Sequence, residues 1–376
     1  MKKKLFIFAA FAISLALLAG LLYIFLVPKT ARTIENQGVD PAPAKLNSFR
    51  GVLADVLDGI GEEATKIEKK IEEAVTNPFS EKENKAAETS PPASPGENNF
   101  TFAILGDTQY FTPGNPKGNF QKAVASISKL NPDLVVQTGD LIRGCEGKSE
   151  DSQDYANWKN TLGTLASKTY AVQGNHDRVE NTDKCDRIWT DAFDFPTNGP
   201  EGFAEFAYSL DFKNSHFVFL DSNKPDAHQI NSTQRSWLEQ DLAKNQKENV
   251  FITFHEPAYP VSDKKEEGLD ADPSERNALW EILDRYNVTA VFNGHEHLVS
   301  RRKIDATVFK DAKNSIYQFV FGNTDSFNHG RPAAGVAEYS NQGQGRYGIV
   351  KVNGKEITIE VYDPSGKLLN TFTFSK

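Results

Sequence analysis

Five short polar runs in this sequence each follow directly on an apolar segment that is rich in β-branched and aromatic residues. The segments are TFAIL, DLVVQT, TYAVQ, NVFITF and TAVFN, and the polar runs begin at Gly106, Gly139, Gly174, His255 and Gly294. Segments of this composition predict β-strands. Because an α/β sheet binds its ligands outside the carboxyl ends of its strands, we expect the five runs to meet in one crevice.

The side chains in these runs suit divalent metal ions. Four of the seven histidines of the chain stand there, together with aspartate and asparagine residues. Carboxylate, amide and imidazole groups bind borderline divalent cations. A carboxylate shared by two cations offsets their repulsion, and a hydroxide held between them is a nucleophile near neutral pH. Turn chemistry explains a single Asn or Asp, but five coincident strand ends favour a hydrolase with two metal ions.

Strands and helices alternate along the chain from Asn99 onward, which predicts an α/β fold with parallel crossovers. Helices are expected over residues 119–130, 152–167, 186–194, 233–244 and 274–286. A hairpin is expected from strands 203–210 and 216–220, and later strands over 298–304, 316–321, 347–352, 356–362 and 367–374. The strands come in two groups, enough for two stacked sheets with helices outside. Residues 99–376 are therefore expected to form one catalytic body.

An uncharged apolar run from Leu5 to Val27 follows three lysines and is long enough to cross a bilayer as a helix. The flanking charge predicts that the N-terminus stays in the cytoplasm and that the rest of the chain is exported. Residues 1–27 are therefore expected to form a single-pass anchor in the cell membrane. The alternative is a signal peptide whose cleavage gives a secreted protein, although no A-x-A-like site follows the run.

Residues 28–98 are expected to lie outside the catalytic body. Apolar residues at steps of three and four predict an amphipathic helix over residues 46–75, which is either a stalk that self-associates or a lone spacer. Residues 80–98 are rich in Glu, Ser, Pro and Ala, as is typical of a disordered linker. The formal net charge of −9 argues against a sequence-independent nucleic-acid-binding protein.

Cys145 and Cys185 are the only cysteines of the chain. Both fall in polar segments of the part that is expected to be exported, and an oxidising compartment permits a bridge between them. Each follows a polar run by a few residues, which would let the two meet above the crevice. A pair of free thiols is the alternative that the sequence leaves open.

In order along the chain, the runs GDTQ, GD, GNHD, FHEP and GHEH resemble the five blocks of the calcineurin-like metallophosphoesterases. The resemblance extends over about residues 100–375, and HEPAY at 255–259 is similar to the branch of the purple acid phosphatases. It implies a four-layer αββα sandwich of two mixed β-sheets with flanking helices and a dinuclear metal site. The implied substrate is a phosphomonoester or phosphodiester, and the implied metals are manganese, iron or zinc.

The resemblance also implies two sets of metal ligands. By position in the blocks, the first metal would be held by Asp107, Asp140 and His297, and the second by Asp140, Asn175, His255 and His295. Gln109 stands where the family usually has a histidine, and its carbonyl oxygen is a weaker candidate ligand of the first metal. His295 and His297 are two residues apart, so both point to the same side of an extended backbone.

His176 is implied to face the substrate, where an imidazole protonates the leaving oxygen or steadies the phosphoryl oxygens. Asp177 is expected to accept the second N–H of that ring and to raise its pKa. Arg143 and either Arg301 or Arg302 are candidate phosphate contacts. The alternative for each arginine is ordinary exposed surface charge.

The sequence thus predicts a membrane-tethered hydrolase of phosphate esters that uses a hydroxide bridging two divalent metals. The alternative is a catalytically silent binding or scaffold protein of the same fold, which Gln109 alone supports. His216 and His228 belong to no block and are expected to be structural. The substrate is not specified, because the loops between the blocks shape the entrance of such a site.

Overall fold

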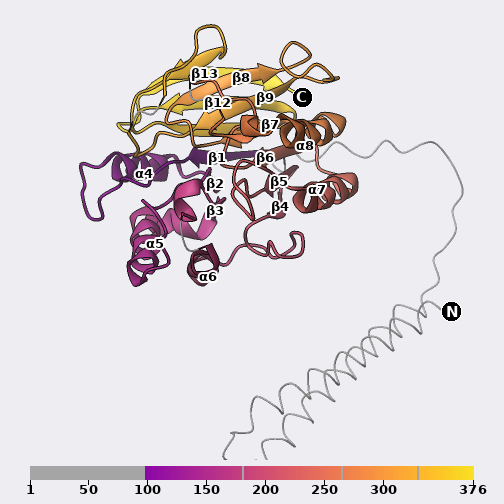
Figure 1. Ribbon diagram of the computed structural model, residues 1–376. Coiled ribbons are helices and arrows are strands. Elements are labelled where there is room, and N and C mark those ends of the chain that lie inside the picture. The colour runs from indigo at the N-terminus through magenta and orange to yellow at the C-terminus, as the bar shows by residue number, and fades with distance from the viewer. Residues whose placement is uncertain (1–97, 180–181, 264–265, 328–329) are drawn as a thin grey trace, which may run out of the picture. The chain divides into compact units, whose positions relative to one another are not determined.

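The computed structural model describes residues 98–179, 182–263, 266–327 and 330–376 (Figure 1). The predicted anchor at 1–27, the amphipathic helix at 46–75 and nearly all of the linker lie outside the described residues, and all three stay predictions. Within the described ranges, no helix combines the length and the apolar character that crossing a membrane requires.

Thirteen strands in the described ranges form two mixed sheets. The first sheet has the order β13-β12-β11-β1-β2-β3 and consists of β1 (Asn99–Leu105), β2 (Leu134–Gln137), β3 (Thr169–Ala171), β11 (Tyr347–Asn353), β12 (Glu356–Tyr362) and β13 (Leu368–Ser375). The second has the order β10-β8-β9-β7-β6-β5-β4 and consists of β4 (Tyr208–Phe212), β5 (Ser215–Phe219), β6 (Asn249–Thr253), β7 (Ala290–Asn293), β8 (Val299–Ile304), β9 (Ile316–Phe321) and β10 (Tyr339–Asn341). Parallel pairing joins β1, β2 and β3 in the first sheet and β5, β6, β7 and β9 in the second.

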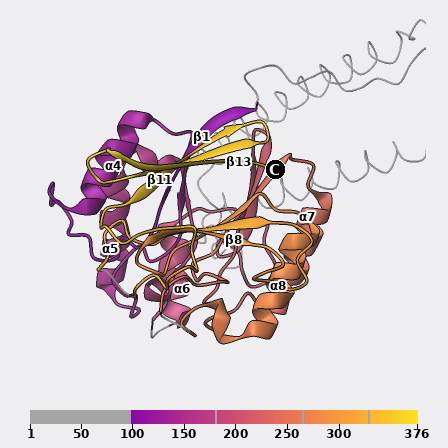
Figure 2. The same ribbon diagram turned by 90° about the horizontal axis from the view of Figure 1, so that it is seen from above.

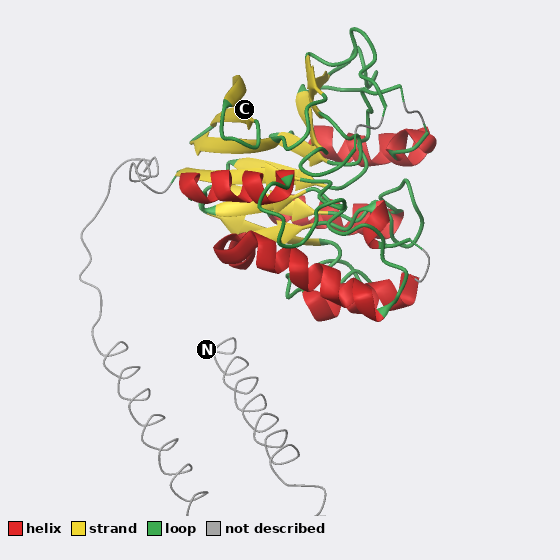
Figure 3. Ribbon diagram, turned by 90° about the vertical axis from the view of Figure 1, so that its left-hand side faces the viewer, coloured by secondary structure: helices red, strands yellow, loops and turns green. Residues whose placement is uncertain are grey.

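Helices flank the sheets on both sides. The α-helices of the described ranges are α4 (Asn119–Leu130), α5 (Ser149–Leu162), α6 (Thr182–Ala192), α7 (Ser232–Lys244) and α8 (Pro273–Arg285). Figure 2 shows α4 and α5 on one side and α7 and α8 on the other, with strands between them. Figure 3 shows helices along the outside of the strands from a third direction. The expected α/β fold with two mixed sheets and flanking helices is confirmed.

The two sheets pack face to face through aromatic side chains. Phe102 of β1 is fully buried. Its ring centroid lies 5.2 Å from that of Phe217, 5.2 Å from that of Phe251 and 5.9 Å from that of Phe292, which belong to β5, β6 and β7. All three pairs meet edge to face, the geometry that aromatic quadrupoles favour. This contact packs β1 against β6 and β7, the strands that lead into the polar runs at Gly106, His255 and Gly294.

Local sequence explains where the helices begin and end. The apolar residues of α4 that face the core recur at steps of three and four: Phe120, Ala123, Val124 and Ile127. The helix ends at Asn131, whose φ of 46° is left-handed, directly before a proline. At the start of α8, the side chain of Asp272 accepts hydrogen bonds from the N–H groups of the first turn.

The structure differs from the expected elements in several places. The helix expected over 152–167 is divided, because α5 ends at Leu162 and a 3-10 helix runs from Gly163 (φ 57°) to Lys168. The strand expected from Phe203 begins only at Tyr208, since the N–H groups of Phe206 and Ala207 both donate to the carbonyl of Phe203 and close a turn. The short edge strand β10 was not expected.

His216 ties the β4–β5 hairpin to α7. Its Nδ1 lies 2.7 Å from Oδ1 of Asp211, and its Nε2 lies 2.8 Å from Oδ2 of Asp241. Burial acts to lower the pKa of His216, but the two carboxylates outweigh burial and raise that pKa above its usual range. The expectation that His216 is structural agrees with these contacts.

Replacing His216 with Gln should destabilise the protein in a pH-dependent way. Because the folded-state pKa is raised, the ion pairs contribute fully below the unfolded pKa of about 6.5 and are lost as pH rises through the folded value. We expect a cost of about 1.5–3 kcal/mol at pH 5.5 and a smaller one at pH 9. Urea unfolding of both proteins at both pH values measures it, and an equal cost at both would contradict the assignment.

Candidate metal centre

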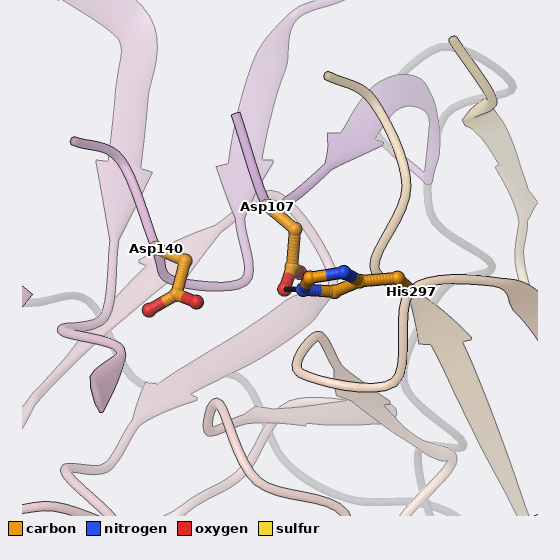
Figure 4. Close-up of side chains that lie close together, drawn as sticks. All are labelled: Asp107, Asp140 and His297. Atoms are coloured by element: carbon orange, nitrogen blue, oxygen red, sulfur yellow. Dashed lines mark ion pairs between the residues drawn. The ribbon is translucent and has the colours of Figure 1, made fainter. Parts of the chain in front are cut away.

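Loops that follow strands of both sheets bring polar side chains together. Asp107 follows β1, Asp140 follows β2, and His297 follows β7. One ligand atom of each residue lies within 4.8 Å of the other two, and all three residues are buried (Figure 4). The Asp107 carboxylate faces the His297 ring, with Oδ1 3.4 Å from Nε2.

Asn175, His255 and His295 form a second set of ligand atoms next to this cluster. Oδ1 of Asn175 lies 3.0 Å from Nε2 of His255 and 3.0 Å from Nδ1 of His295. The centroids of the two imidazole rings are 5.2 Å apart. Nε2 of His255 also lies 3.4 Å from Oδ1 of Asp140. Loops after β3, β6 and β7 therefore supply the second set, and Asp140 from the loop after β2 lies next to both sets.

Gln109 lies between Asp140 and His297 of the first cluster. Its Nε2 is 3.1 Å from Oδ2 of Asp140 and 3.3 Å from Nε2 of His297. Its Oε1 is buried and has no hydrogen-bonding partner in the part of the chain that the structure describes. Half a turn of the amide would exchange its nitrogen and oxygen positions and aim the oxygen at the carboxylate and the imidazole. A cation there would give that oxygen a partner.

The backbone is left-handed at three of these residues. φ is 54° at Asp107, 55° at Asp140 and 67° at His295, and such strain costs about 1–3 kcal/mol per residue and clusters at functional sites. The N–H of His295 donates to both oxygens of Asp107 at 3.0 and 3.1 Å. The N–H of His176 donates to Oδ1 of Asp140 at 2.8 Å. Backbone groups thus fix both carboxylates.

Two glycines allow the side chains to come this close. A Cβ on Gly139, whose φ is +102°, would lie 2.4 Å from Nδ1 of His255. A Cβ on Gly174 would lie 2.1 Å from Oδ1 of Asp140. Both distances are far below van der Waals contact, so any larger residue would displace a donor side chain.

Each of the three imidazoles in the two donor sets also has a backbone hydrogen-bonding partner, which orients the ring. The partners are the carbonyl of Thr138 for Nδ1 of His255 (2.8 Å), the carbonyl of Phe327 for Nδ1 of His297, and the backbone of Glu267 for His295. A ring nitrogen that donates to a carbonyl leaves the other nitrogen as the basic one, which is how proteins prepare a metal-binding histidine.

Burial and charge decide how this cluster binds protons when no cation is bound. Burial raises the pKa of Asp107 above its usual range. Burial acts to lower the pKa of His255, but the carboxylates of Asp140 and Asp107 outweigh it and raise that pKa to about 9. Protons therefore neutralise the site in the metal-free protein. Divalent cations would replace these protons, so the donor set fits them.

A cavity of about 540 Å³ lies beside the second set, within the size range of small-molecule sites. Its lining includes Arg143, Asn175, His176, Arg178, His228 and Glu256. Nδ1 of His176 lies 2.9 Å from the carbonyl oxygen of Arg143, so Nε2 is the ring nitrogen that remains for a ligand. The positions of His176 and Arg143 are compatible with the predicted substrate contacts.

The predicted contact between Asp177 and the His176 ring is wrong. The Asp177 carboxylate is buried and accepts hydrogen bonds from the N–H groups of Leu141 and Gly174 and from the hydroxyl of Tyr155. Residues 175–177 form a 3-10 turn, in which successive side chains diverge by about 120°. Burial and the nearby Asp140 raise the pKa of Asp177 to about 7. Asp177 thus braces the loops after β2 and β3.

The predicted substrate contact of Arg301 does not agree with its surroundings. Its guanidinium carbon lies 3.7 Å from the ring centroid of Phe372, and its Nε lies 3.0 Å from Glu338. Arg302 points to the opposite face of β8, where it donates to the carbonyls of Tyr259 and Pro260. Both guanidinium groups are thus held by protein groups.

Cys145 and Cys185 form a disulfide bond, which decides between the two alternatives that the sequence left open. The bond connects the loop after β2 to α6. The N–H of Cys145 also donates to the carbonyl of His176 at 2.8 Å. The bridge thus lies directly beside the loop that carries Asn175 and His176.

His228 was expected to be structural, yet it lines the cavity, where its Nδ1 lies 3.0 Å from Oε2 of the buried Glu256. The order of strand, helix and strand over residues 215–253 is a sequence signal for this position, because it predicts parallel strands. The structure pairs β5 with β6 in parallel, so the loop after β5 lies at the edge that carries His255. Phe327 was also missed. It follows β9 in a loop whose composition gives no sign of a site.

Proteins with related sequences include phosphoesterases. A 3′,5′-cyclic-nucleotide phosphodiesterase of Nostoc sp. is 26% identical over 213 residues, which cover 55% of this chain and 72% of that protein. Purple acid phosphatase 15 of Arabidopsis thaliana is 25% identical over 243 residues, which cover 57% of this chain but only 43% of that protein.

Solved structures share the fold. The purple acid phosphatase PPD1 from yellow lupin (Lupinus luteus) seeds matches with a TM-score of 0.61 at 17% identity, covering 76% of this chain and 55% of the lupin chain. The family model for calcineurin-like phosphoesterases matches residues 100–299, more than half of the 376-residue chain. The protein therefore belongs to the calcineurin-like phosphoesterase family.

Proposed function

We propose that this protein hydrolyses phosphate esters with the help of two divalent cations that share Asp140. The position of Asp140 carries the proposal, since its Oδ1 is 3.4 Å from Nε2 of His255 and its Oδ2 is 3.1 Å from Nε2 of Gln109. One carboxylate thus contacts both donor sets. The first cation would be held by Asp107, Asp140 and His297 with Gln109, and the second by Asp140, Asn175, His255 and His295.

When bound, the cations supply Lewis acidity and a nucleophile at neutral pH. The residues of the chain orient the substrate and move a proton. In the doubly protonated ring of His176, Nδ1–H stays hydrogen-bonded to the carbonyl of Arg143, while Nε2–H gives its proton to the leaving oxygen as the bond from that oxygen to phosphorus breaks. The exposed guanidinium of Arg143 pairs with a phosphoryl oxygen at the cavity.

The relatives support phosphate esters as the substrate class. Several relatives are named phosphodiesterases and one is named a phosphatase, so the proposal covers both phosphodiesters and phosphomonoesters. Manganese, iron and zinc all suit a set of carboxylate, amide and imidazole ligands.

Asp140→Asn should lower both the rate of hydrolysis and the metal content of the protein. The amide cannot neutralise two cations, and we expect turnover of p-nitrophenyl phosphate and bis-p-nitrophenyl phosphate to fall at least about 100-fold. Metal content by mass spectrometry should fall in the same samples. The assay uses the full-length chain with added manganese.

Asp284→Asn is the matched control, because Asp284 is also a buried carboxylate but accepts hydrogen bonds from the N–H groups of Lys313 and Asn314. This variant should keep its metal and its turnover. An Asp140→Asn protein with the turnover and metal content of the wild type would refute the proposal.

Gln109→His should tighten binding of the first cation, because imidazole is a stronger ligand than an amide oxygen. We expect the Kd for the first manganese ion to fall by about tenfold, which corresponds to about 1.4 kcal/mol of binding free energy. Gln109→Ala should raise it. Titration calorimetry of the metal-free variants measures both effects, and identical Kd values in all three proteins would exclude Gln109 from the site.

We further propose that residues 5–27 anchor the chain in the cell membrane with the catalytic body outside the cytoplasm. The apolar run after three lysines supports this orientation. The disulfide between Cys145 and Cys185 supports it independently, because such bonds persist in oxidising compartments.

Fractionation of cells that express the full-length chain tests the anchor. The protein should stay in the membrane pellet after alkaline carbonate extraction, and protease added to intact spheroplasts should digest it. Deletion of residues 2–27 should abolish membrane retention. Recovery of the intact chain in the soluble cytoplasmic fraction would contradict this topology.

A further inference from the structure

Two of the most exposed apolar side chains, Val179 and Phe327, lie near the candidate metal centre. Among the described residues, the large apolar side chains with the highest exposure are Leu130, Val179, Phe327 and Leu368. Phe327 is the most exposed of them at 63%, and its carbonyl contacts Nδ1 of His297. Val179 lines the cavity that also contains His176. Phe327 is thus a large apolar side chain exposed directly beside a proposed metal ligand.

Phe327 and Tyr110 together form a surface that we name the aromatic shelf. Their ring centroids are 4.5 Å apart. The backbone that carries the shelf is tied to the site, because the N–H of Tyr110 donates to the carbonyl of Asp325 and the N–H of Asp325 donates to the carbonyl of Asp107. Gln109 directly precedes Tyr110.

The shelf continues to the residues that are proposed to act on the substrate. The Tyr110 ring lies 6.5 Å from the His176 ring between centroids, edge to face. The guanidinium carbon of Arg143 lies 5.6 Å from the Tyr110 centroid. Aromatic faces and a guanidinium plane both attract flat π-systems. The group attached to the leaving oxygen would therefore meet the shelf when that oxygen faces His176.

We propose that the aromatic shelf binds a flat aromatic ring in the alcohol part of the substrate, so that the enzyme prefers phosphate esters of aromatic or nucleoside alcohols over those of glycerol-like or alkyl alcohols. This specificity rests on the proposed function, since the phosphate must be held at the metal centre. The ring stacks on Phe327 and against the edge of Tyr110, and Arg143 covers the side nearest the phosphate.

The test compares two phosphonates that differ only in the flatness of the ring. Benzylphosphonate and cyclohexylmethylphosphonate are not hydrolysed, carry the same anionic group and are similar in size. Titration calorimetry on the manganese-loaded full-length protein should give a Kd about three- to tenfold lower for benzylphosphonate. A second pair compares the 5′-methylenephosphonate analogue of AMP with the same molecule without its base. Tighter binding of the compound with the base indicates a nucleoside ester as the substrate, whereas an effect in the benzyl pair alone indicates an ester of a small aromatic alcohol.

Phe327→Leu keeps an apolar side chain but removes the flat ring, and Phe327→Ala removes both. In both variants the ratio of the two Kd values should fall towards one, whereas Leu368→Ala, an equally apolar exposed position on β13, should keep the wild-type ratio. Manganese content is measured in each protein, because Phe327 lies next to His297.

Equal affinity of the wild type for both phosphonates of each pair, or a ratio that Phe327→Leu leaves unchanged at full manganese content, would overturn the shelf. If manganese binds but no phosphonate does, the proposed function fails and the shelf fails with it. The two failures are therefore distinguishable in one set of titrations.

Discussion

Two buried carboxylates, those of Asp107 and Asp140, stand at the ends of adjacent strands, and the rest of the site follows from the need to neutralise them. Burial of an ionised carboxylate without a counter-charge is strongly unfavourable. Within the described residues, their ion-pairing partners are the imidazoles of His297 and His255. The metal-free protein meets the cost with protons, as the raised pKa of His255 indicates. Bound divalent cations would supply the counter-charge that these buried carboxylates need, in place of the protons.

The fold concentrates these groups by stacking two sheets whose parallel strands end at the same place. Phe102 locks the first sheet onto the second through Phe217 and Phe251, so loops far apart in sequence reach each other. The loops are then braced by buried polar contacts. Asp177 holds the backbone of Leu141, and the Cys145–Cys185 bridge fastens the neighbouring loop. Rigid support of this kind is what a metal site requires.

Much of this arrangement could be predicted, because alternation along a strand and the short polar run after it decide which side chains reach the crevice. This holds for the positions of Asp107, Asp140 and His255. Sequence failed where a turn sets the direction of a side chain. Asp177 faces inward because it lies in a 3-10 turn, and Arg301 is held by Phe372 from the other sheet. No periodicity encodes such contacts, and none marks Phe327 either.

The central claim is that Asp140 lies between two cations. Anomalous X-ray diffraction from crystals soaked in manganese tests it most directly. The account predicts two peaks, one among Asp107, Gln109 and His297 and one among Asn175, His255 and His295, each within ligand distance of an Asp140 oxygen. A single peak, or peaks that lie out of reach of Asp140, would contradict the account.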